Sequence, residues 1–114
     1  QGQEQDLVLL GDYNMIPTED AAQFELLNQG IGLDFLQMSL PPGATSHLNA
    51  SGEPDSLLDG IALSPSAHQE YTPHSFEILP LDLSFRRGRA WFRKNVSDHL
   101  PLRLSFDTTV DHDP

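Results

Sequence analysis

Runs of apolar residues along the chain predict several short strands. The clearest is Asp6 to Leu10, an apolar run stopped by Gly11, which we expect to form a buried strand. From Leu100 to Phe106 every second residue is apolar, which is the period of a half-buried strand. Four further segments also fit strands: Leu33 to Met38, an edge strand at Ala44 to Leu48, Leu57 to Leu63, and Ser75 to Leu79.

One main helix is predicted, from Glu19 to Gln29. A Pro-Thr-Glu-Asp sequence opens it, with a capping hydroxyl and with acids where the helix dipole favours negative charge. Phe24 and Leu27 lie one turn apart and share a face, and Gly30 is a suitable stop. With the strands, this predicts an α+β fold whose sheet is mostly antiparallel and carries the helix on one face.

The remaining segments are predicted as loops. Residues 43–54 are rich in Gly, Ser, Asn and Pro, and residues 86–95 form an irregular basic loop that contains Trp91 and Phe92. We expect a single domain over residues 1–107, followed by an acidic, disordered tail at 108–114.

Composition excludes several classes of chemistry. The 114 residues include no Cys, which rules out disulfides, thiolate catalysis and cysteine zinc sites. No apolar run approaches the roughly 18 residues of a membrane helix. The first residues are polar and include no Met, so we expect the chain to be a piece of a longer one.

Charge is strongly acidic but unevenly distributed. The formal net charge is -11, and five of the six basic residues fall within residues 86–94. Such a surface repels polyanions at long range. Acidic clusters hold divalent cations and a local basic loop holds phosphate, so the two together suit a phosphoester substrate.

Asp12 and Asn14 follow the first predicted strand directly. If the chain stays extended, their spacing directs both side chains to the same side. A carboxylate so placed can orient a water, and an amide can donate to a phosphoryl oxygen. A plain strand-to-loop turn explains the same residues without any chemistry.

Two further acids and one His suggest a site. Asp98 and His99 precede the last predicted strand, where an oxygen ligand for Mg²⁺ and an imidazole would lie side by side. Asp59 lies inside an apolar strand and needs a partner there. If that partner is His99, Asp59 would fix the imidazole tautomer. The alternatives are a turn before the strand for the first two residues, and a solvent-facing Asp59.

Three sequences occur in an order that resembles a known family: LVLLGDYN, LLDGIALS and VSDHLPLRLSF. Together they resemble the C-terminal half of the endonuclease/exonuclease/phosphatase superfamily, which includes deoxyribonucleases, abasic-site endonucleases, inositol-polyphosphate phosphatases and neutral sphingomyelinases. The resemblance covers about residues 5–106. It implies half of a four-layer αββα sandwich, with a Mg²⁺ or Mn²⁺ cofactor.

The resemblance also implies roles for individual residues. Asp12 would position the attacking water, Asn14 would contact phosphate, Asp59 would pair with the catalytic His99, and Asp98 would be the metal-side carboxylate. Gly60 departs from the family pattern, which often has an aromatic residue there, so the packing beside the site is in doubt.

The family's principal metal-binding Glu has no counterpart in this sequence. We therefore expect the chain alone to bind Mg²⁺ weakly and to be inactive or nearly so. The exposed face of its sheet should be covered by the missing N-terminal half or by a second copy of the chain.

The basic loop supplies candidate phosphate-binding residues. In a nuclease, its guanidinium groups would grip phosphates and its aromatic side chains would stack on a base. The candidates are Arg86, Arg87, Arg89, Arg93 and Trp91. In the alternative interpretation the aromatic residues pack beneath the loop. Four histidines without motif support are expected to be ordinary surface residues: His47, His68, His74 and His112.

A metal-dependent hydrolase, most simply a nuclease, is therefore the first hypothesis. A lipid or small-molecule phosphatase or phosphodiesterase of the same family is the next, because a fold does not fix its substrate. A non-catalytic interaction domain that retains the fold is the third.

Overall fold

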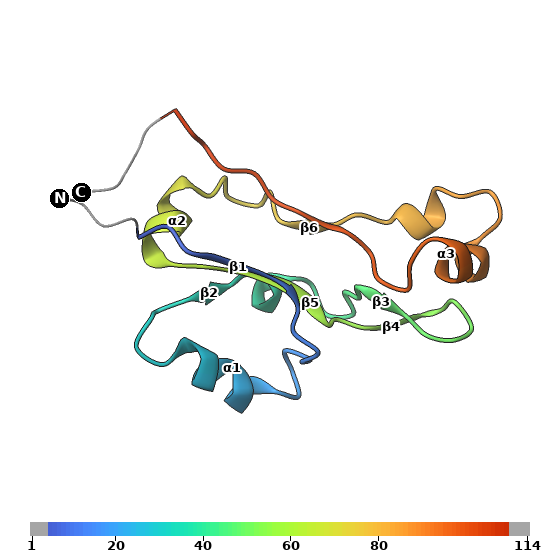
Figure 1. The fold of residues 1–114 in the computed structure, drawn as a ribbon, viewed down its shortest axis with the longest axis horizontal. Helices are drawn as coiled ribbons and strands as arrows, with labels where there is room; N and C mark the ends of the chain where they lie inside the picture. Colours follow the sequence, from blue (N-terminus) through green and yellow to red (C-terminus); the bar gives the residue numbers. More distant parts are fainter. Residues whose placement is uncertain (1–4, 110–114) are drawn as a thin grey trace.

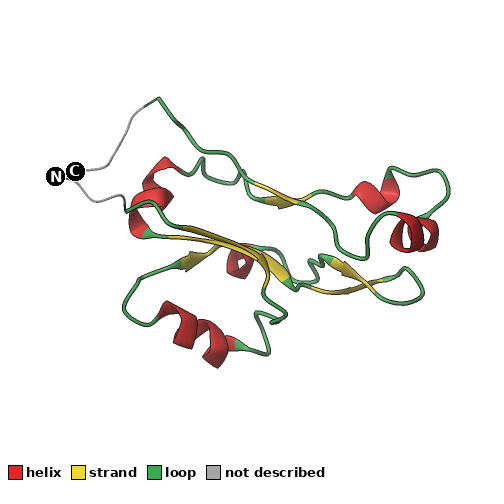
Figure 2. Cartoon of the chain, viewed as in Figure 1, coloured by secondary structure: helices red, strands yellow, loops and turns green. Residues whose placement is uncertain are grey.

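The computed structural model describes residues 5–109. It has the predicted α+β class, with antiparallel sheets and few helices (Figure 1 and Figure 2). The main sheet has three strands in the order β1-β5-β2, where β1 spans Val8–Asp12, β5 spans Asp59–Leu63 and β2 spans Asp34–Phe35.

β5 is the central strand, and both of its faces are buried. Ile61 and Leu63 point to one face and join a core cluster with Phe76. Ala62 points to the other face, against a cluster that includes Phe24 of helix α1 (Ala21–Asn28). Alternate residues of a strand point to opposite faces, so this short strand anchors two separate cores.

β1 contradicts the prediction of a buried strand. All five of its residues are exposed, and Val8, Leu9 and Leu10 keep 37%, 39% and 68% of their accessible surface. The reason is topological, because β1 pairs with β5 along one edge and lies at the margin of the sheet. An apolar run predicts a strand but does not show what covers it.

Two short antiparallel ribbons extend the fold. β3 (His47–Leu48) pairs with β4 (Pro54–Ser56), and β6 (Glu77–Ile78) pairs with β7 (Leu102–Arg103). The predicted edge strand at 44–48 and the strand at 100–106 are therefore present but much shorter than expected. A third core cluster joins these ribbons to helix α3, and its buried members are Leu48, Phe92 and Leu100.

Helical turns stand in two segments that were predicted otherwise, and one further helix was not predicted. The predicted basic loop 86–95 contains helix α3 (Arg89–Asn95), because Phe92 is buried on its inner face. The strand predicted at 33–38 ends after β2 and continues as a 3₁₀ turn, η1 (Leu36–Ser39). Helix α2 (Pro65–Glu70) was not predicted, although Ser64 caps it and Pro65 occupies its first turn.

A second 3₁₀ turn, η2 (Leu81–Leu83), precedes α3. No helix in residues 5–109 is long and apolar enough to cross a membrane. The predicted acidic tail lies mostly outside the described residues, which end at Thr109.

Candidate active site

Strand pairing brings two of the predicted acids together. Asp12 is the last residue of β1 and Asp59 the first of β5, and they are direct partners in the antiparallel register. Directly opposed residues project from the same face of a sheet. Asp12 is exposed and Asp59 is half-buried, so the pair lies at the solvent boundary of the sheet.

A bridge between distant segments brings His99 to this pair. The backbone of residues 46–48 lies beside that of residues 98–100, with hydrogen bonds of 2.7 and 2.8 Å on either side of a bridge between His47 and His99. His99 lies outside the named strands, in the segment between α3 and β7. This long-range contact fixes where its imidazole can reach.

The imidazole of His99 is hydrogen-bonded to Asp59. His99 Nδ1 lies 2.8 Å from Asp59 Oδ2, which is the pairing expected from the sequence if Asp59 has a histidine partner. With the proton on Nδ1, the ring donates to the carboxylate and leaves Nε2 free. The side chain of Asp59 is 14% exposed, so this hydrogen bond is partly shielded from water.

Ser46, which the sequence did not predict as a site residue, supports the carboxylate of Asp59. It is fully buried, and its hydroxyl donates to Asp59 Oδ2 at 2.6 Å. The Oγ atom of Ser46 in turn accepts hydrogen bonds from the backbone N–H groups of Leu58 and Asp59, both at 3.1 Å. One hydroxyl therefore holds the start of β5 and orients the carboxylate that binds His99.

The pKa of His99 is raised above its ordinary value. The largest cause is the hydrogen bond to Asp59, which outweighs the opposing effect of burial. The negative charges of Asp59, Asp12 and Asp98 raise this pKa further. The imidazole therefore stays protonated to higher pH than a free histidine.

Asp12 faces the other side of the imidazole. Its Oδ2 lies 3.9 Å from His99 Nε2, which is beyond hydrogen-bond length. A single oxygen atom placed about 2.8 Å from both groups fits between them. A water can therefore bridge this gap, accepting from the imidazole N–H and donating to the carboxylate.

Asn14 does not extend the strand as the spacing argument assumed. Its φ is 50°, in the left-handed region, and its backbone N–H donates to Asp12 Oδ1 at 2.8 Å. The turn interpretation of this sequence is therefore correct for the backbone. The turn leaves Asp12 Oδ2 directed at His99, and the two interpretations are compatible.

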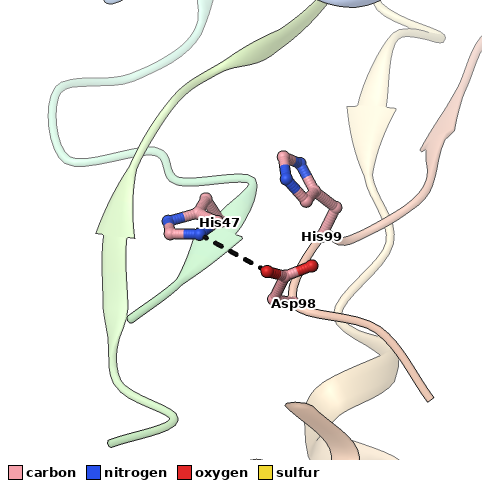
Figure 3. A group of neighbouring side chains, drawn as sticks. All are labelled: His47, Asp98 and His99. Atoms are coloured by element: carbon pink, nitrogen blue, oxygen red, sulfur yellow. Dashed lines mark ion pairs between the residues drawn. The ribbon is translucent and has the colours of Figure 1, made fainter. Parts of the chain in front are cut away.

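Asp98 faces a histidine that sequence reasoning set aside as an ordinary surface residue. Its Oδ2 lies 3.9 Å from Nε2 of His47 (Figure 3). Nδ1 of His47 lies 3.2 Å from Asp55 Oδ2. The rings of His47 and His99 are 5.1 Å apart at their centroids. The sequence placed His47 in the predicted edge strand, but gave no sign of its two carboxylate neighbours, Asp55 and Asp98, which lie in other segments of the chain.

The donor atoms at this point do not match the Mg²⁺ or Mn²⁺ site that the family resemblance implies. Within residues 5–109, one group of three potential ligands gathers: His47, Asp98 and His99, with ligand atoms within 4.8 Å of one another. Two of these three donors are nitrogens, whereas Mg²⁺ prefers six oxygens in an octahedron. These side chains do not build a magnesium site on their own.

Most of the predicted phosphate-binding residues have structural partners. Arg89 Nε lies 2.9 Å from the buried carboxylate of Asp82, and Arg93 Nε donates to the Leu48 carbonyl at 3.3 Å. The guanidinium of Arg87 lies 5.3 Å from the centre of the Trp91 ring. These contacts fasten α3 to the rest of the fold.

Arg86 and Arg87 remain solvent-exposed, together with Lys94. Trp91 also lies 5.6 Å from the Phe85 ring, centroid to centroid, so it belongs to an aromatic group around α3. This agrees with the alternative interpretation, in which the aromatic residues pack against the surrounding chain.

No family model, curated protein or solved structure matches this chain. Any functional assignment therefore depends on the chain's own residues and on the geometry just described.

Proposed function

We propose that this chain forms the C-terminal part of a metal-dependent phosphoester hydrolase of the endonuclease/exonuclease/phosphatase type. One observation carries the proposal: the imidazole of His99 lies between two carboxylates, 2.8 Å from Asp59 on one side and 3.9 Å from Asp12 on the other. Three segments far apart in sequence are needed to build this arrangement, and each carries one of the motifs behind the resemblance.

The arrangement suits in-line attack of water on a phosphoester. The hydrogen bond to Asp59 favours the protonated form of His99, whose Nε2–H would donate to a phosphoryl oxygen as charge develops there. Asp12 would accept a hydrogen bond from the attacking water and align it. Asn14 is exposed beside Asp12, where its amide would donate to a second phosphoryl oxygen.

The exposed sheet margin supports the idea of a further structural half. Apolar side chains of β1 are open to solvent, and a pocket beside Asp59 is lined partly by Leu10 and Gly11 of that strand. A covering half, or a second copy of the chain, would bury this surface. The same half would also supply the oxygen ligands that a Mg²⁺ or Mn²⁺ site still lacks.

We propose nuclease activity as the first specific function, and a lipid or small-molecule phosphatase as the second. The exposed Arg86 and Arg87 support contact with phosphate. The structural contacts of Arg89, Arg93 and Trp91 reduce the support for an extended nucleic-acid surface. The formal net charge of -11 acts in the same direction.

A substrate screen tests the proposal. The 114-residue chain and a longer chain extended upstream would each be incubated with Mg²⁺ and with DNA, RNA or lipid phosphoesters. We expect the longer chain to hydrolyse one class and the 114-residue chain to show almost no turnover. Equal turnover by both would contradict the need for a further half, and no hydrolysis by the longer chain would favour a non-catalytic interaction domain.

A further inference from the structure

The orientation of two histidines at the site suggests a ligand other than Mg²⁺. In each ring, Nδ1 lies beside a carboxylate: Asp59 at 2.8 Å for His99, and Asp55 at 3.2 Å for His47. A metal-binding histidine almost always donates its second ring N–H to a carboxylate, a backbone carbonyl or water, which fixes the tautomer and makes the free nitrogen a better ligand. Both rings therefore present an unprotonated Nε2 when the pair is neutral.

A third donor lies near the two rings. In Figure 3 His47 and His99 lie next to each other with Asp98 below them, and the dashed line joins Asp98 to His47, whose Nε2 lies 3.9 Å from Asp98 Oδ2. One donor atom from each of these residues lies within 4.8 Å of the other two. All three side chains are half-buried, and a dissolved ion can reach them.

One of these distances, 3.9 Å between His47 Nε2 and Asp98 Oδ2, is near that of an occupied zinc site, and the others, within 4.8 Å, would have to shorten further when an ion binds. With metal–ligand bonds of about 2.0–2.1 Å, two ligands of a tetrahedral ion are about 3.3 Å apart. The His47–Asp98 pair would close by roughly 0.6 Å, which a small side-chain rotation supplies. Two imidazoles and one carboxylate are a donor set that Zn²⁺ accepts readily, with a fourth position left for water.

We propose that His47, Asp98 and His99 form a Zn²⁺ site, with Asp55 and Asp59 as the residues that orient the two histidines. His47 distinguishes the proposed zinc site from the hydrolase site, because the proposed hydrolysis uses only one histidine, His99. Asp98 and His99 belong to both sites. The zinc proposal concerns binding alone, so it can be tested in the absence of any phosphoester substrate.

The chain offers a matched control for this site. His68 Nε2 lies 2.9 Å from Asp34 Oδ2, which reproduces one histidine–carboxylate pair on the surface. Within residues 5–109 that pair belongs to no group of three potential ligands. His68→Ala therefore removes an equivalent imidazole without touching the proposed site.

The test is Zn²⁺ binding to the 114-residue chain, measured by calorimetric titration, with Co²⁺ absorption as a second readout. We expect one Zn²⁺ per chain that millimolar Mg²⁺ does not displace, and visible Co²⁺ bands of a four-coordinate site. His47→Ala should weaken binding at least tenfold and abolish the bands, while His68→Ala should leave both unchanged.

A second variant separates binding from folding. Asp55 is half-exposed and its replacement spares the core, so Asp55→Asn should keep the circular dichroism spectrum and weaken Zn²⁺ binding by about tenfold. Unchanged affinity in both His47→Ala and Asp55→Asn, or loss of affinity in His68→Ala, would overturn the zinc site. Neither result bears on the hydrolase proposal, which the substrate screen tests separately.

Discussion

Replacement of Ser46 by Ala tests how the candidate site is built. The Ser46 hydroxyl is fully buried and takes part in three hydrogen bonds: one to the Asp59 carboxylate, and one each from the backbone N–H groups of Leu58 and Asp59. A typical hydrogen bond contributes about 1 kcal/mol net, and a buried donor left without an acceptor costs about 1–3 kcal/mol. We therefore expect Ser46→Ala to lower the free energy of unfolding by about 2–4 kcal/mol.

The assay is urea unfolding followed by circular dichroism. Ser39→Ala is the control, because that exposed hydroxyl makes one hydrogen bond, to the Leu36 carbonyl, and its loss should change stability by less than about 0.5 kcal/mol. If Ser46→Ala were as stable as Ser39→Ala, Ser46 would not hold the start of β5 and the account of the site's support would be wrong.

Three further predictions concern residues around the site. Asp59→Asn should lower the pKa of His99, measured by NMR titration of the ring protons, because the hydrogen bond to Asp59 is the largest cause of the raised value. In the wild-type protein, the stability that His99 contributes is complete below the unfolded pKa of about 6.5 and is lost as the pH rises through the raised folded pKa. The free energy of unfolding of the wild-type protein should therefore fall over that pH range. An identical titration curve in the variant would contradict this.

Gly60→Ala should lower the free energy of unfolding by about 1–3 kcal/mol, measured by thermal unfolding, because a Cβ at that position would lie 2.2 Å from the buried amide of Gln37. An unchanged stability would instead show that the Gln37 amide moves freely. Arg89→Ala should cost about 2–3 kcal/mol in urea unfolding, because it leaves its buried aspartate partner unpaired, whereas unchanged stability would restore a phosphate-binding role for this arginine.

Local patterns in the sequence located much of the fold. The apolar run before Gly11 marks β1, the Pro-Thr-Glu-Asp opening marks the region of α1, and the strand around Asp59 is β5. These elements follow from short-range periodicity and stop signals, which neighbouring residues determine. The pairing of Asp59 with His99 was also foreseeable, because an acid in a strand needs a partner.

Long-range contacts account for what the sequence did not reveal. Ser46 and His47 enter the site because residues 46–48 lie beside residues 98–100, and no local signal encodes that bridge. The absence of an aromatic residue at Gly60 put the packing beside the site in doubt, but the buried Gln37 side chain lies against Gly60 and accepts the Ile61 N–H at 3.1 Å. Such outcomes depend on which segments meet in three dimensions.

The segment around α3 shows a different reason for error. Its clustered arginines suggested an open basic loop, but Phe92 is buried beneath it and Arg89 pairs with a buried acid. A charged residue predicts only that the charged end of its side chain is exposed. The apolar part of that side chain, and the residues next to it in sequence, can still be buried.

The most direct test of the account is the effect of His99→Ala on Mg²⁺-dependent phosphoester hydrolysis by the longer chain, with His68→Ala as the matched control. If His99 stabilises the phosphoryl charge, its loss should lower kcat by about 10²–10³-fold while His68→Ala leaves kcat unchanged. Equal activity in the two variants would contradict the central claim that the imidazole between Asp59 and Asp12 performs the chemistry.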